Sequence, residues 1–330
     1  MATSPAAAVG TPAWGCDAGA VAPIEQRVDV GGTTLMVTEA GPPDGPPVLL
    51  LHGFPDSRRL WDAQVEALAA AGHRVLAPDL RGYGDSDRPT ATADYALEHL
   101  IADVAGLLRA GGITRAALVG HDWGAVLAWA VAAAHPELVE RLVVVSVGHP
   151  AARARAGLRQ QVAGAYVPVF LLPGLAERLL PLGRFRWLRR AWGPDARGGP
   201  HLARQVADMS RPGALTAGLA WYRANIPVPR PGRALRILGR TSTGTSTGTS
   251  TQASTGTSTG RPRRRVACPV MGVWSTGDPF LTERQMTGSA DHVAGPWRYE
   301  RIEGAGHWVP VEAADRLSTL LVDFLAGDPG

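Results

Sequence analysis

Hydrophobic residues in the first half of the chain follow two patterns that alternate with each other. Short apolar runs at 48–51, 74–78 and 116–119 have the length of strands that are covered on both faces. Between them, residues 61–71 and 97–110 repeat apolar positions every three or four residues, as amphipathic helices do. Strands that alternate with helices predict an α/β fold with a mostly parallel, doubly covered sheet.

Hydrophobic periodicity also predicts elements before residue 48 and after residue 119. Residues 26–30 and 33–39 alternate apolar and polar side chains around a pair of glycines, which predicts a hairpin before the parallel strands. Further elements are expected as a helix over 125–135, strands over 141–147, 270–274 and 298–302, and an amphipathic helix over 313–325.

Composition divides the chain into segments. Residues 1–22 are rich in Ala, Pro and Gly without periodicity, which predicts a disordered tail. Residues 148–240 carry helical stretches and no convincing strand, so we expect a helical cap inserted into the core. Residues 241–265 repeat Thr-Ser-Thr-Gly and end in an Arg-rich run, which predicts a flexible linker. The two parts of the core are then 23–147 and 266–330.

The charge and cysteine content of the chain limit the kinds of partner and compartment that we expect. All 33 basic residues are arginines, and the net charge of +4 is small for 330 residues, so no nucleic-acid partner is expected. A solvated run is the favoured interpretation of the arginines at 261–265, with a nucleic-acid or anionic-surface patch as the alternative. Two cysteines make no disulfide framework, and neither a signal peptide nor a membrane span is evident. We expect a cytoplasmic monomer or homodimer without a membrane partner.

A candidate nucleophile lies where the apolar run at 116–119 meets the following helix. The sequence Gly120-His121-Asp122-Trp123-Gly124 has the strand-turn-helix context of a nucleophile elbow, with a carboxylate at its centre. Two glycines allow the strand and helix backbones to approach closely. The elbow would present Asp122 at the carboxyl edge of the sheet, beside the positive end of a helix. An ordinary loop with an Asp helix cap is the alternative.

Two later residues complete a catalytic set. His307 lies in a glycine-flanked loop after a strand and is a candidate base, and Asp278 follows the preceding strand and would orient it. A surface histidine and an Asp-Pro turn are the alternatives. The order of nucleophile, acid and histidine is that of α/β-hydrolases. The backbone N–H groups of Trp123 and Phe54 are the expected oxyanion donors.

The carboxylate at the elbow indicates which class of substrate the protein attacks. Asp122 is ionised at neutral pH and can displace a leaving group from a saturated carbon, which gives an alkyl-enzyme ester. Water activated by His307 would then attack the carboxyl carbon. The pattern therefore favours epoxides or haloalkanes over esters and amides, and the absence of Ser, Cys or Thr at the elbow disfavours a protease or lipase.

These residues resemble the epoxide hydrolases of the α/β-hydrolase fold over about residues 24–325. The motifs that carry the resemblance are His52-Gly53-Phe54-Pro55, Arg81-Gly82-Tyr83-Gly84-Asp85-Ser86, Gly120-His121-Asp122-Trp123-Gly124, Gly277-Asp278 and Gly304-Ala305-Gly306-His307-Trp308. Haloalkane dehalogenases share most of them, so the choice between the families depends on the cap.

The resemblance implies two further catalytic residues in the cap. Epoxide hydrolases of this kind use two cap tyrosines to protonate the epoxide oxygen, and Tyr166 and Tyr222 are similar to them in context. A phenol can supply the proton that a departing alkoxide needs. Pro168 is awkward if Tyr166 begins a helix or lies within one, since proline lacks an N–H. The expected substrate is an epoxide and the product a vicinal diol, without metal or organic cofactor.

Two other functions remain open. A haloalkane or fluoroacetate dehalogenase could use the same Asp122, Asp278 and His307, with the Trp123 indole N–H binding halide. Phe54 offers no second side-chain donor for that ion, and fluoroacetate enzymes carry Arg where this chain has Trp123. A non-catalytic receptor of the same fold is the second alternative, and the complete set of three residues disfavours it.

Overall fold

A twisted sheet forms the centre of the molecule. The computed structural model describes residues 23–192, 199–227 and 265–327, and within them the sheet has eight strands in the order β1-β2-β4-β3-β5-β6-β7-β8. The strands are β1 Ile24–Asp29, β2 Thr34–Ala40, β3 Pro47–Leu51, β4 Arg74–Pro78, β5 Ala116–His121, β6 Val139–Val145, β7 Val270–Ser275 and β8 Trp297–Ile302. β2 is antiparallel to β1 and β4, and the other neighbours are parallel.

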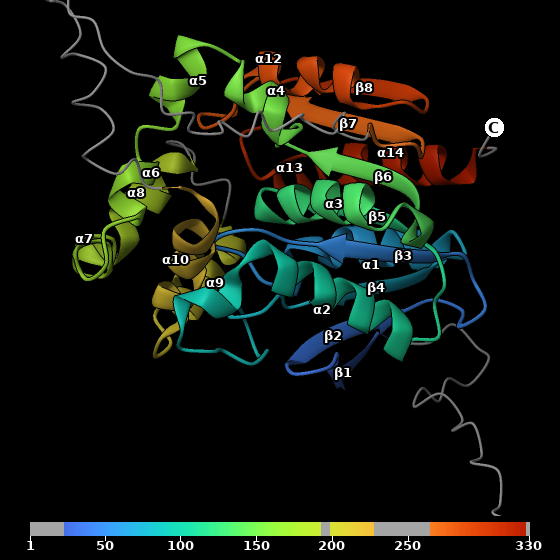
Figure 1. Cartoon of the computed structure of the whole chain (residues 1–330), viewed down its shortest axis with the longest axis horizontal. Helices are drawn as coiled ribbons and strands as arrows, with labels where there is room; N and C mark the ends of the chain where they lie inside the picture. The colour runs from blue at the N-terminus through green and yellow to red at the C-terminus, as the bar shows by residue number, and fades with distance from the viewer. Residues whose placement is uncertain (1–22, 193–198, 228–264, 328–330) are drawn as a thin grey trace, which may run out of the picture.

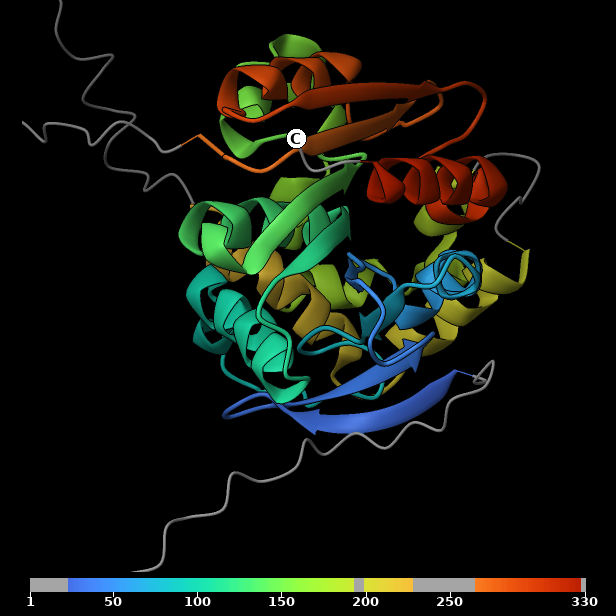
Figure 2. The same cartoon turned by 90° about the vertical axis from the view of Figure 1, so that its right-hand side faces the viewer.

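Helices cover both faces of this sheet. In the core they are η1 Arg58–Trp61, α1 Asp62–Ala70, η2 Thr92–Tyr95, α2 Leu97–Ala110, α3 Trp123–Ala134, η3 Pro136–Leu138, α12 Glu283–Thr287, η4 Gly288–His292, α13 Val309–Glu312 and α14 Ala314–Ala326. Figure 2 shows α2 and α3 on one face of the sheet and α1 and α14 on the other. All residues of β5 and β7 are buried, because both faces are covered and the apolar runs have no polar side.

A run of helices joins β6 to β7, and its described residues contain no strand. We call residues 150–225 the cap segment. Its helices are α4 Pro150–Ala154, α5 Leu158–Ala163, α6 Val167–Phe170, α7 Leu175–Leu179, α8 Leu182–Ala191, α9 Gly199–Met209 and α10 Ala214–Asn225. The parallel strands point their carboxyl ends toward this segment (Figure 1), which is where ligands bind in open parallel sheets.

The predicted fold class is confirmed, and the expected elements lie within about two residues of their predicted ends. The helix expected at 125–135 begins earlier, at Trp123, directly after the candidate nucleophile. The predicted tail at 1–22 and the repeats at 241–260 lie outside the described residues, so the division into domains stays a prediction. Within the part of the chain that the structure describes, none of the helices has the length and apolar character needed to cross a membrane.

Candidate active site

Asp122 occupies a strained turn between β5 and α3. Its φ is 51° and its ψ is −120°, a conformation that an L-residue other than glycine adopts at a cost. A Cβ at Gly120 would lie 2.4 Å from the Gly124 carbonyl oxygen, and one at Gly124 would lie 2.0 Å from that of Leu51. Only glycine fits at either position, so the two glycines of the motif allow the turn that raises Asp122 at the sheet edge.

Two backbone N–H groups point at the Asp122 carboxylate. The Phe54 N–H donates to Asp122 Oδ1 at 2.9 Å, and the Trp123 N–H also donates to this carboxylate. Burial raises the pKa of Asp122, while the neighbouring His307 and the two N–H donors oppose that rise. Both predicted oxyanion donors therefore lie at one carboxyl group. The His52 ring holds the loop in place, because it accepts the Leu80 N–H at 3.0 Å and donates to the Gly53 carbonyl at 3.0 Å.

His307 lies between two carboxylates. Its Nδ1–H donates to Asp278 Oδ2 at 2.9 Å, and its Nε2 lies 3.8 Å from Asp122 Oδ2. The Asp278 side chain is fully buried and its other oxygen accepts the backbone N–H groups of Phe280 and Leu281. Burial disfavours the charged imidazolium, but the attraction of Asp278 and then Asp122 outweighs it and raises the pKa of His307 to about 9.

A second histidine, from the elbow itself, fixes the position of His307. His121 donates through Nε2 to the His307 carbonyl oxygen at 2.9 Å, and Ser146 donates through its hydroxyl to the same oxygen at 3.1 Å. Burial, together with the charge of His307, lowers the pKa of His121 to about 3, so it stays neutral. Nothing local in the sequence indicates this role, because the partner lies 186 residues away.

Both cap tyrosines line the same cavity as Asp122 and His307. Tyr222, on α10, packs edge-on against Trp123 with 5.0 Å between ring centres, and its phenol is hydrogen-bonded to that of Tyr166. Burial, and then the charge of Asp122, raises the pKa of both phenols above the usual value of 10.0. Tyr166 precedes α6, so Pro168 stands in the first turn, where no N–H is needed. The concern that Pro168 raised at the sequence level therefore has no structural basis.

Comparison with known proteins agrees with this geometry. Residues 46–314 match the family model described as the alpha/beta hydrolase fold. Epoxide hydrolase A of Mycobacterium tuberculosis is 33% identical over 93% of this chain and 98% of its own length. The chain belongs to the epoxide hydrolase family of the α/β-hydrolase fold. This confirms the resemblance and the enzyme class expected from the motifs.

Other members of the family match over similar lengths. Epoxide hydrolase 3 of Xenopus tropicalis is 30% identical, with 92% of this chain and 77% of the relative covered. The crystal structure of epoxide hydrolase A from Mycobacterium thermoresistibile superposes with a TM-score of 0.72 at 28% identity, covering 93% of this chain and 99% of the other.

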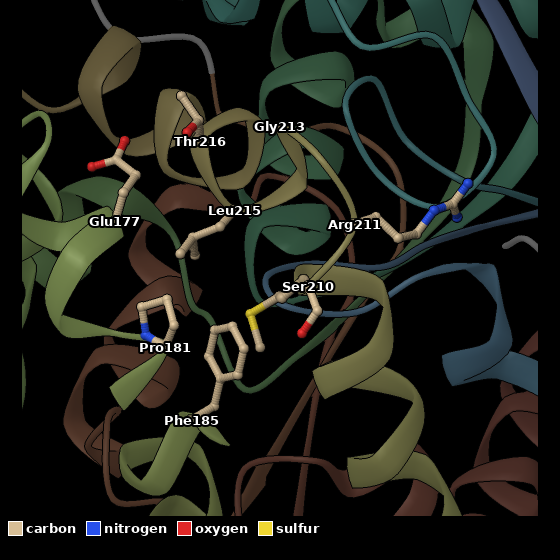
Figure 3. Close-up of a pocket in the computed structure, with 9 residues that line it drawn as sticks. Glu177, Pro181, Phe185, Ser210, Arg211, Gly213, Leu215 and Thr216 are labelled. Carbon is tan, nitrogen blue, oxygen red and sulfur yellow. The ribbon is translucent and has the colours of Figure 1, made fainter. Parts of the chain in front are cut away.

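The cavity beside Asp122 and His307 is narrow and mostly aromatic. Its volume is about 20 Å³, which is room for one water molecule. Its walls are formed by Phe54, Pro55, Asp122, Tyr166, Phe170, Trp187, Tyr222, Phe280, His307 and Trp308. A larger cavity of about 320 Å³ lies within the cap segment (Figure 3), where Pro181, Phe185 and Leu215 form part of its lining. The two cavities share no lining residue, so the larger one does not contain the nucleophile.

A buried polar cluster beside the triad ties the core to the cap segment. Asp56 is 2% exposed and accepts hydrogen bonds from His201 and Gln205 of α9 at 2.7 Å each, and from the Trp308 indole N–H at 3.1 Å. Burial alone would raise the pKa of Asp56, but its bonds and the charge of His201 lower it. The sequence carries no local signal for this cluster.

Proposed function

We propose that the protein hydrolyses an epoxide to a vicinal diol through a covalent ester on Asp122. One observation carries this proposal: a carboxylate, a carboxylate-bound imidazole and two phenols face one aromatic cavity. The aromatic walls suit an apolar epoxide, and each reacting group that the mechanism needs lies within that cavity.

The first step opens the ring. A carboxylate oxygen of Asp122 attacks one ring carbon, the bond from that carbon to the epoxide oxygen breaks, and an ester forms. The departing oxygen takes a proton from Tyr166 or Tyr222. Both phenols keep their protons until this point, because their pKa values lie above the ordinary one. The hydrogen bond between the phenols lowers the pKa of Tyr166, so Tyr222 can support Tyr166 as Tyr166 loses its proton.

The second step hydrolyses the ester. Water gives a proton to His307 Nε2 and attacks the carboxyl carbon of Asp122, while the N–H groups of Phe54 and Trp123 stabilise the negative oxygen. The ester bond then breaks, the diol oxygen takes the proton that His307 carries, and the proton left on the Asp122 carboxyl group returns through water to the phenolate of Tyr166 or Tyr222. Esterification removes the negative charge of Asp122, which is one cause of the high His307 pKa, so ring opening favours the neutral imidazole that the second step needs.

The dehalogenase alternative is weaker. The Trp123 side chain is hydrogen-bonded to Tyr222, so its indole N–H is engaged rather than directed at a halide. Phe54 provides only its backbone N–H, and that group already donates to Asp122. These contacts disfavour the dehalogenase, and the membership of the epoxide hydrolase family disfavours a non-catalytic ligand receptor. A cytoplasmic location and a monomeric or homodimeric state without nucleic acid stay predictions.

Intact-protein mass spectrometry tests the mechanism. We expect His307→Gln, incubated with an aryl epoxide such as a styrene oxide, to gain the mass of one substrate molecule. The same treatment of Asp122→Ala should add no mass to a folded protein. Halide release from haloalkanes without diol formation from epoxides would favour the dehalogenase, and full turnover by His307→Gln would exclude this histidine as the base.

A further inference from the structure

Large apolar side chains reach solvent in one part of the described chain. Exposed fractions of 45–74% are found for Leu158, Val162, Leu172, Leu175, Leu179 and Leu182, all in the cap segment. Single exposed apolar residues are common on protein surfaces, but a group confined to 25 consecutive positions indicates an interaction surface.

Two pairs of these residues have helical spacing. Leu158 and Val162 are four residues apart on α5, and Leu175 and Leu179 are four residues apart on α7. Leu172 and Leu182 lie on either side of α7, with Gly174, whose φ is 75°, between Leu172 and the helix. Ala176 and Leu180 are buried, so Leu175 and Leu179 form a second apolar side of α7, turned away from the packed one.

Arginines alternate along the sequence with these exposed apolar residues. Residues 150–192 hold eight arginines and a single acidic residue, Glu177, which gives this segment a net charge of +7. Glu177 is paired with Arg223 at 2.6 Å. The rest of the chain has 25 arginines and 28 acidic residues, a net charge of −3. Seven of the eight arginines are exposed, namely Arg155, Arg159, Arg178, Arg184, Arg186, Arg189 and Arg190.

We propose that this basic apolar surface, residues 155–190, binds peripherally to an anionic lipid bilayer. The leucines would enter the interface between headgroups and acyl chains, and the arginines would contact lipid phosphates while their stems stay against apolar surface. The surface belongs to the cap segment, which lies beyond the carboxyl ends of the parallel strands (Figure 1), and Asp122 directly follows one of these strands, β5. This inference replaces the sequence-based expectation of no membrane partner; it goes beyond the proposed function and does not depend on it.

Charge favours a lipid over the other candidate occupants. A second copy would bring an equally basic surface, and the two would repel. The chain's own residues 228–264 contain no acidic residue, so they offer no countercharge either. An anionic bilayer supplies both the negative charge and an apolar layer.

Vesicle co-sedimentation with the full-length protein tests the proposal. We expect binding to phosphatidylcholine vesicles that contain phosphatidylglycerol, little binding to phosphatidylcholine alone, and weaker binding as salt rises from about 0.1 M to about 1 M. Arg159→Gln/Arg178→Gln should lower the partition coefficient about 25-fold, because each arginine near such a surface contributes about fivefold. Leu175→Ser/Leu179→Ser should lower it as well, without change in diol formation from a water-soluble epoxide.

A matched control removes two arginines elsewhere. Arg109 and Arg115 are exposed near the start of β5, at the opposite end of the sheet, so Arg109→Gln/Arg115→Gln should bind as the unmodified protein does. Equal loss in this control, or equal binding to neutral vesicles, would overturn the proposal. So would sedimentation velocity that shows a dimer broken by Leu175→Ser/Leu179→Ser, with no vesicle binding, because the surface would then join two copies.

Discussion

His201 of the cap segment and Asp56 of the core are joined by a buried hydrogen bond of 2.7 Å. Asp56 also holds the indole of Trp308, the residue after His307, so one carboxylate links the cap to the loop of His307. Removal of this carboxylate would leave three buried donors without a partner.

Asp56→Ala should therefore lower the free energy of unfolding by about 3 kcal/mol, measured by urea denaturation. A matched control is Asp62→Ala, which removes an exposed bond between core and cap, from Asp62 to Arg204 at 3.2 Å. Because both partners are largely in solvent, the control should change stability by less than about 1 kcal/mol. Equal losses in the two variants would contradict the importance of burial.

Removal of either cap phenol should slow ring opening. Tyr222→Phe keeps the ring and loses the proton, so we expect the rate of ester formation to fall about 10²–10⁴-fold, followed by rapid-quench mass spectrometry. Tyr83→Phe is the matched control, since the Tyr83 hydroxyl is also buried but has no hydrogen-bond partner and does not line the cavity. A Tyr83→Phe variant as slow as Tyr222→Phe would refute the assignment.

Asp278→Asn should act on the second step. Loss of the charge that holds the imidazolium lowers the pKa of His307 and leaves the ring less well oriented. We expect hydrolysis of the ester to slow on the order of 10³–10⁴-fold, with ester accumulating during turnover. If ring opening slowed instead and no ester accumulated, His307 and Asp278 would have a different role.

The raised His307 pKa also predicts how stability depends on pH. An imidazole with a pKa of 6.5 when unfolded and about 9 when folded stabilises the folded state fully below pH 6.5. This contribution declines as pH rises toward 9, because the folded state then gives up a proton that the unfolded state has already lost. Unfolding free energies should fall across this window, and fall less in His307→Gln. If the unfolding free energy fell equally steeply with pH in both proteins, the raised pKa of His307 would be contradicted.

The sequence predicted those parts of the fold and of the candidate site whose residues lie close together along the chain. The elbow was predictable because Gly120 and Gly124 flank Asp122 within five residues, and the loops of Asp278 and His307 directly follow strands. The bond from Asp56 to His201 spans 145 residues and has no local signal.

The spacing of apolar residues does not show whether they are buried. Leu175 and Leu179 have the periodicity of a buried stripe, and only the packing of the neighbouring Ala176 and Leu180 shows which side of the helix faces inward. A sequence pattern identifies an apolar side without indicating whether anything covers it.

The 20 Å³ cavity beside Asp122 sets a condition on turnover. Because this space holds little more than one water, we expect the aromatic wall to expand when an epoxide binds and again when the diol departs. The frequency of that expansion is an upper limit on the overall rate, whatever the speed of the chemistry. Substitutions that loosen the aromatic wall, such as Trp187→Ala, should therefore speed up bulky substrates more than small ones, which a kcat/KM comparison over epoxides of graded size would reveal.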